Sequence, residues 1–289
     1  MRVTQSMLSN NMLRNLSSSY GKMGDLQRQV ETGKKVNRPS DDPVVVMKGI
    51  NYRTALGKIE QYERNIGEVN NWLDTSDNTL DKVNAALQRT NDLLVQAANG
   101  TTTEEDRDKI KAELKQLRQH VQDMSNTKIG EKYIFSGTKT NVPPFDKTTG
   151  TYSTDPAFEK TINIEIFDGI SLQSNITPLN TFQSIDDMFA RLDSATTTED
   201  FSNSLTELNK NSNELLTIRS DIGARQNRVE LMEDRLASQE ISATKQMSDN
   251  EDVDYEKAIT NMITQESIHR AALSVGARII QPSLTDFLR

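Results

Sequence analysis

Residues that could carry catalysis or hold a metal ion are few in this chain. Its two histidines, His120 and His269, lie too far apart in the sequence to form a local metal motif, and there is no cysteine. The sequence also lacks a glycine-rich phosphate loop and the Gly-x-Ser-x-Gly elbow of serine hydrolases. We therefore expect no enzyme activity, no cofactor and no metal site.

Carboxylates cluster at two places where acid–base chemistry or calcium binding has to be considered. Asp41 and Asp42 are adjacent, but they lie between two prolines and Pro43 can open a helix, so helix capping explains them better. Residues 251–254 hold three carboxylates but lack the spaced ligands and central glycine of a calcium loop. We interpret this second cluster as a solvated linker.

The composition excludes two classes of partner. The chain has 289 residues and a formal net charge of -8, with its charges scattered, so we expect neither nucleic-acid binding nor membrane insertion. The first 16 residues lack the apolar core of a cleavable secretory signal, so an extracellular protein of this kind would leave by another route. Only 34% of residues are hydrophobic, which suits long helices that each bury one stripe.

We therefore expect long helices to position the functional residues of this chain. From Tyr52 to Ala97, apolar residues recur at alternating steps of three and four, which predicts one continuous coiled-coil-like helix. A capping box from Thr102 to Glu105 predicts a second helix that folds back on the first as an antiparallel hairpin. Weaker stripes predict three more helices, at about residues 5–32, 199–248 and 256–281.

The middle of the chain has a different pattern. Residues 130–137 are strand-like between two glycines, and three isoleucines at alternate positions from Ile162 to Ile166 precede the turn dipeptide Asp168-Gly169. Residues 138–195 therefore predict a small β-rich insert.

The predicted fold is mainly α, a long coiled-coil-like helical rod built from both chain ends with a small β-rich inserted domain. We expect a terminal helical assembly domain (1–42 and 250–289), a long-helix rod domain (43–137 and 196–249) and a β-rich surface domain (138–195). The two terminal helices have weak stripes, so we expect them to be largely disordered in the monomer and to fold on assembly.

Two segments resemble the flagellin family of bacteria. Residues 32–42, TGKKVNRPSDD, are similar to the N-terminal flagellin signature, and residues 218–229, IRSDIGARQNRV, to a C-terminal flagellin segment. Pro43 stands where flagellins usually have a small residue, and residues 130–137, GEKYIFSG, resemble family members that join the hook region to the filament. Residues 281–288 differ from the usual flagellin tail.

The resemblance implies a structural subunit that passes unfolded through the flagellar type III apparatus and is then extracellular. It implies hook-associated protein 1 and flagellin as neighbours on either side, copies of the chain in a ring, and an export chaperone on the C-terminal helix. The terminal helices would form the inner wall of a tube, with the long helices as the next layer and the insert facing solvent.

We expect the assembly interface to include residues of both chain ends and of the second long helix. Among them Gly223 and Ala224 are small enough to permit close helix approach. The full set is Leu8, Leu16, Met23, Val30, Asn37, Asp41, Asp42, Gly223, Ala224, Gln226, Asn227, Arg228, Ile268, Ala272, Val275 and Ile279. Two alternatives stay open, the filament subunit flagellin itself and a surface binding module that acts through the β insert.

Overall fold

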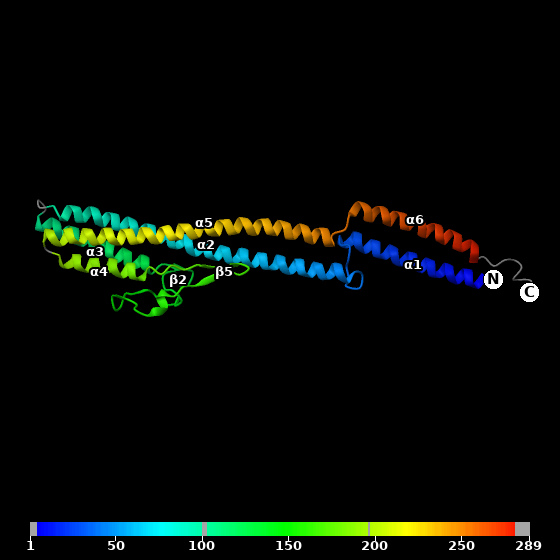
Figure 1. Ribbon diagram of the computed structural model, residues 1–289, viewed down its shortest axis with the longest axis horizontal. Coiled ribbons are helices and arrows are strands. Elements are labelled where there is room, and N and C mark those ends of the chain that lie inside the picture. The colour runs from blue at the N-terminus through cyan, green and yellow to red at the C-terminus, as the bar shows by residue number, and fades with distance from the viewer. Residues whose placement is uncertain (1–4, 100–102, 196, 281–289) are drawn as a thin grey trace, which may run out of the picture. The chain divides into compact units, whose positions relative to one another are not determined.

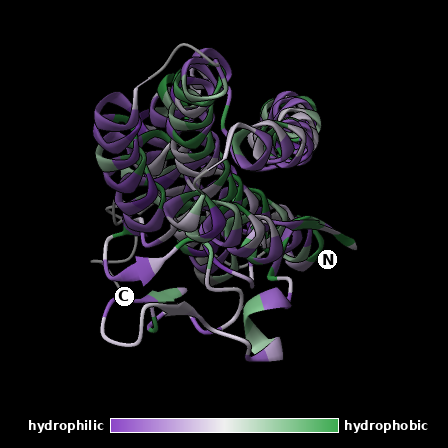
Figure 2. Cartoon of the chain, turned by 90° about the vertical axis from the view of Figure 1, so that its left-hand side faces the viewer, coloured by the Kyte–Doolittle hydropathy of each residue, from purple (hydrophilic) through white to green (hydrophobic). Residues whose placement is uncertain are grey.

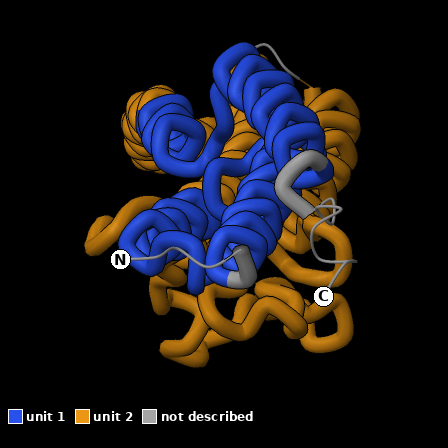
Figure 3. The backbone as a smooth tube through the Cα atoms, turned by 90° about the vertical axis from the view of Figure 1, so that its right-hand side faces the viewer, with its two compact units in different colours: residues 1–58, 239–289 blue, residues 59–238 orange. Residues whose placement is uncertain are grey.

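The computed structural model describes residues 5–99, 103–195 and 197–280. The chain divides into two compact units (Figure 3). Residues 1–58 and 239–289 form the first, which we call the terminal unit, and residues 59–238 form the second, the central unit.

Helices make up most of the described chain, which confirms the mainly α fold (Figure 1). They are α1 (Gln5–Thr32), α2 (Pro43–Ala97), α3 (Glu104–Ser125), α4 (Leu179–Ser194), α5 (Thr198–Glu251), α6 (Tyr255–Ile280) and the short 3-10 helix Pro156–Glu159. Three antiparallel strand pairs accompany them: β1 (Lys128–Ile129) with β2 (Lys132–Tyr133), β3 (Phe145–Asp146) with β4 (Thr151–Tyr152), and β5 (Asn163–Phe167) with β6 (Ile170–Gln173). Over the described residues, no helix has the length and apolarity needed to cross a bilayer.

The core of the central unit follows two heptad series. In this unit every seventh residue of α2 is buried, and so is every seventh residue of α5, as coiled-coil packing requires. These residues are Ile59, Ile66, Leu73, Leu80, Leu87 and Leu94 in α2, and Phe201, Leu208, Leu215, Ile222, Val229 and Leu236 in α5. In Figure 2 the helices carry both hydrophilic and hydrophobic residues, as amphipathic helices do. The heptad prediction is thus confirmed from Ile59 onward.

Polar contacts show that α2 and α5 run antiparallel within the central unit. Arg219 pairs with Asp77 at 2.9 Å and with Asp81 at 2.8 Å, and seven residues further along α5 the Gln226 amide donates to Asp74 at 2.8 Å. Residues further along α5 therefore contact residues earlier in α2, as expected for antiparallel helices.

Helix α4 corrects the prediction for the insert, because residues 179–194 are helical although they fall in the segment expected to be β-rich. Their buried apolar side chains recur at steps of three and four, which is the helical period. Helix α4 packs on α3, where Asp186 accepts from Arg118 Nε at 2.8 Å and from Arg118 Nη2 at 2.9 Å.

The expected hairpin at residues 162–172 is confirmed as β5–β6, with Gly169 at φ 71° in its turn. One side of this hairpin covers the helices. The Phe167 ring stacks on Tyr62 of α2 at 6.2 Å between ring centroids, and the Arg235 guanidinium of α5 lies 4.2 Å from the Phe167 centroid. The insert therefore braces the helix pair as well as facing solvent.

Residues 130–137 form less strand than expected, since only Lys132–Tyr133 pair, but they anchor the insert. Ile134 and Phe135 are buried. Gly137 has φ 57° and lies against the carbonyl oxygens of Ala157 and Phe158, so no side chain fits there.

Threonine caps the start of α3 as predicted, but the capping residue is Thr103, one residue later than expected. The Thr103 hydroxyl accepts from the Asp106 N–H and caps α3, whereas Thr102 of the expected capping box lies outside the described residues. At the start of α5, Thr197 and Asp200 exchange hydrogen bonds between their side chains and backbone N–H groups.

Candidate functional site

The first and last helices lie side by side in the terminal unit (Figure 1, blue and red). They meet through small and polar groups. The buried Ser19 hydroxyl accepts from Gln265 Nε2 at 2.8 Å, and a Cβ placed on Gly276 would come 2.9 Å from Met12 Cε. The pair is thus held at close range but buries little apolar surface.

Large apolar side chains of the terminal unit are mostly exposed. Among its described residues, Ala258 is the one hydrophobic residue that is buried. By contrast, many large apolar residues of this unit are exposed: Met7, Leu8, Leu13, Tyr20, Val44, Met47, Ile50, Ile241, Tyr255, Ile259, Ile263, Ile268, Leu273 and Val275. Because burial of apolar area is the main driving force for folding, this unit lacks a core of its own.

The predicted interface residues of the terminal helices are only partly exposed. Leu8, Ile268 and Val275 are exposed. Leu16, Met23, Val30 and Ala272 are half-buried. Ile279 belongs to α6, but its side chain is outside what the structure describes.

In the loop between α1 and α2, Asp42 caps a helix as the sequence predicts, whereas Asp41 instead accepts hydrogen bonds within the loop itself. Asp42 Oδ1 accepts from the N–H groups of Val44 at 2.9 Å and Val45 at 3.1 Å, which caps α2. Asp41 Oδ2 accepts from the N–H of Asn37 at 3.3 Å and from that of the next residue at 3.0 Å. Asn37 itself is exposed.

A cluster of charges joins the end of α1, the start of α2 and the break between α5 and α6. We call it the junction clasp and define it as Lys34, Arg53, Glu251 and Asp252. Glu251 accepts from Arg53 at 2.6 Å and lies 3.5 Å from Lys34, which in turn pairs with Asp252 at 2.7 Å. All four residues belong to the terminal unit.

Backbone hydrogen bonds complete the junction clasp. The Lys35 N–H donates to the Glu251 carbonyl at 2.7 Å, and the Val253 N–H donates to the Gly33 carbonyl at 2.9 Å. The hydrogen bond from the Lys34 ammonium, with a second from Ser248, holds the pKa of Asp252 below its usual range, and the same bond to Asp252 raises the pKa of Lys34.

The interpretation of residues 251–254 as a solvated linker is therefore wrong at Glu251, which is 6% exposed. Sequence reasoning missed Lys34 and Arg53 because their carboxylate partner lies about 200 residues away in the chain. Helix α5 also runs through the expected polar interruption, ending at Glu251. A carboxylate at a helix C-terminus is unfavourable unless cations neutralise it, and the junction clasp supplies two.

The predicted small-residue site on α5 has no helix against it within the described part of the chain. Gly223 is half-buried, and a Cβ added to it would meet no atom of the described residues within 4 Å outside its own helix. Ala224, Asn227 and Arg228 are exposed, whereas Gln226 contacts α2 through Asp74. Close approach at Gly223 would need another chain.

Comparison with known proteins shows which family shares this sequence and architecture. The family model for the bacterial flagellin N-terminal helical region matches residues 3–140, and the model for the flagellin C-terminal helical region matches residues 205–288. The flagellar hook-associated protein 3 of Escherichia coli K12 is 28% identical over 94% of this chain and 95% of its own length. The flagellin of Bacillus subtilis is 25% identical over 97% of both chains.

Among solved structures, a putative flagellar hook-associated protein from Vibrio parahaemolyticus superposes with a TM-score of 0.66 and 25% identity, and the match covers 73% of this chain and 100% of that one. The two regional models together span most of the sequence, so the chain belongs to the flagellin family. Within that family its full-length likeness to hook-associated protein 3 makes it a structural subunit of the bacterial flagellum.

Proposed function

We propose that this chain forms the junction between the hook region and the filament. The observation that carries the proposal is the uneven distribution of exposed apolar side chains, most of which lie in the terminal unit, while the central unit buries most of its own. A subunit with such ends can bury these apolar side chains by stacking against other subunits.

Two features favour a junction subunit over other members of the family. The likeness to hook-associated protein 3 covers 94% of this chain and 95% of that protein. Pro43 also stands where flagellins usually have a small residue, and residues 130–137 resemble junction members. The full-length similarity to a flagellin keeps the filament subunit as the second candidate.

The proposal includes the neighbours on the axis. Copies of the chain would form one ring-like layer, with hook-associated protein 1 on the hook side and flagellin on the filament side. Because head-to-tail contacts are heterologous, each layer can present its upper surface to a different protein.

The proposal also includes how the chain is exported to the hook–filament junction. The chain would be exported through the flagellar type III apparatus and be extracellular, and an export chaperone would cover the exposed apolar residues of α6 before assembly. Ile259, Ile263 and Ile268 are exposed along that helix and supply such a binding surface.

Deletion of the gene, followed by electron microscopy and analysis of the medium, tests the proposal. A junction subunit predicts intact hooks, no attached filaments and flagellin released into the medium. If the filament protein itself disappears, the chain is the flagellin. If filaments stay attached and cells swim, the junction role is wrong.

A further inference from the structure

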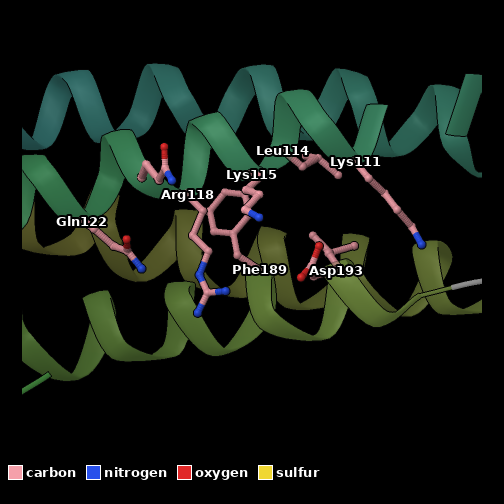
Figure 4. Close-up of a pocket in the computed structure, with 9 residues that line it drawn as sticks. Lys111, Leu114, Lys115, Arg118, Gln122, Phe189 and Asp193 are labelled. Atoms are coloured by element: carbon pink, nitrogen blue, oxygen red, sulfur yellow. The ribbon is translucent and has the colours of Figure 1, made fainter. Parts of the chain in front are cut away.

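A small pocket opens between α3 and α4 in the central unit (Figure 4). Its volume is about 120 Å³. Leu114 of α3 and Phe189 and Leu192 of α4 form its apolar floor. An engineered protein cavity of about 150 Å³ admits a benzene ring, so a pocket of this size suits one aliphatic side chain.

Positive charges line the α3 side of this pocket. Figure 4 shows Lys111, Lys115 and Arg118 along α3, with Asp193 opposite them on α4. Arg118 forms an ion pair with Asp186. Neither Lys111 nor Lys115 has an ion-pair partner among the described residues. The two lysines are four residues apart, so they lie on one face of the helix. They form a basic patch on a chain whose formal net charge is -8.

A complementary surface exists on α5 of the same chain. Leu231 is the most exposed large apolar residue in the described part of the central unit, at 68%. Glu230 and Asp234 lie on one side of it, are exposed, and are also four residues apart, whereas Arg228 and Arg235 lie on its other side. A pair of carboxylates at this spacing matches the Lys111 and Lys115 pair in distance and opposes it in charge.

We propose that the α5 surface around Leu231 of one copy docks on the α3–α4 pocket of a second copy. The Leu231 side chain enters the pocket, Glu230 and Asp234 face Lys111 and Lys115, and the contact is heterologous because two different surfaces meet. This inference rests on the proposed function, in which copies of the chain lie side by side.

The contact fixes how neighbouring copies are offset. Glu113 of α3 pairs with Arg89 of α2 at 2.7 Å, whereas Gln226 of α5 pairs with Asp74 of α2 at 2.8 Å. Leu231 lies five residues beyond Gln226 on α5, so the two surfaces are about 20 residues apart along α2, or roughly 30 Å at about 1.5 Å per residue. Copies joined in this way are staggered along the helix axis within the proposed layer.

Cysteine crosslinking in the full-length chain tests the contact, because the natural sequence has no cysteine and gives no background. Lys115→Cys and Glu230→Cys are combined in one chain, expressed in the deleted strain, and treated with a short bismaleimide on assembled flagella. The matched control combines Lys115→Cys with Leu216→Cys, since Leu216 is exposed on the same helix. We expect dimers and higher multimers from the first pair and monomer from the control.

The outcomes separate this inference from the proposed function. If filaments attach but the first pair gives no more multimer than the control, the contact is wrong and the junction role stands. If the chain is absent from the hook–filament junction, both fail. A benzophenone probe on Lys115→Cys adds the identity of the occupant, because labelling of residues 227–234 of a second copy is expected and labelling of a different protein would overturn the assignment.

Discussion

Glu251 lies directly against Gly49 in the junction clasp. A Cβ built on Gly49 would overlap the Glu251 carboxylate, so the α2 backbone and the end of α5 approach as closely as a glycine allows. The carboxylate cannot simply swing away, because Arg53 and Lys34 hold it and it is almost fully buried. One glycine therefore permits the contact that ties the two chain ends together.

Gly49→Ala should break the junction clasp. The added methyl group displaces the Glu251 carboxylate from Arg53, and overpacking of this kind costs about 1–3 kcal/mol. Gly57→Ala is the control, since a Cβ there meets nothing and should add about 1 kcal/mol of helix stability. Urea unfolding, monitored by circular dichroism, measures the free energy of unfolding of both variants. Equal effects of the two substitutions would show that Gly49 has no special role.

Acid should loosen the junction clasp through Asp252. The lowered pKa of Asp252 means that its stabilising contribution is complete above about pH 4, the unfolded value, and is lost as the pH falls through the folded value. The raised pKa of Lys34 keeps its own contribution complete below about pH 10. Hydrogen exchange of the Lys35 and Val253 amides, corrected for intrinsic rates, should therefore speed up below about pH 4.

The matched variant for this pH dependence is Asp252→Asn. Its junction clasp should be weaker at neutral pH and should show a smaller change in exchange between about pH 6 and about pH 3. An unchanged acid response in the variant would assign the effect to another carboxylate.

Arg118→Leu should destabilise the central unit. The substitution leaves Asp186, which is 8% exposed, without its bidentate partner. Because the pair is part-buried and Gln122 still donates to Asp186, the loss of the charged hydrogen bonds should cost about 1.5–3 kcal/mol. The double variant Arg118→Leu with Asp186→Leu should recover much of that loss, because no charge is left buried. Thermal unfolding of the two variants and the parent measures this. A double variant no more stable than the single one would refute the ion-pair explanation.

Gly137→Ala should disrupt the insert more than Gly150→Ala does. Both glycines have positive φ, which costs an alanine about 1–2 kcal/mol. Only at Gly137 would the new Cβ also strike backbone oxygens, those of Ala157 and Phe158. Limited proteolysis across residues 138–178 should therefore be faster for Gly137→Ala, and similar rates in the two variants would contradict the steric argument.

The sequence predicts those parts of the fold that depend on local period and capping. The spacing of Ile59 to Leu94 and the Asp42 cap both express contacts within a few residues or one helix face. Helix α4 was open to the same reasoning, because Phe182, Ile185 and Phe189 have helical spacing, but the strand signals around it dominated the prediction.

The junction clasp and the pocket could not be found in this way. Glu251 and Arg53 are 198 residues apart, and a run of acidic residues looks the same whether it is solvated or buried. Lys111 and Lys115 likewise look like ordinary solvated lysines until α4 is placed beside α3. Both features depend on tertiary packing, which no local pattern encodes.

The central claim is that the apolar side chains of α1 and α6 become buried only when copies assemble. Hydrogen exchange of these two helices, measured by mass spectrometry on the free full-length chain and on assembled flagella, tests it directly. The account predicts fast exchange in the free chain and strong protection after assembly, with α2 and α5 of the central unit protected in both. Equal, strong protection of α1 and α6 in the free chain would contradict it.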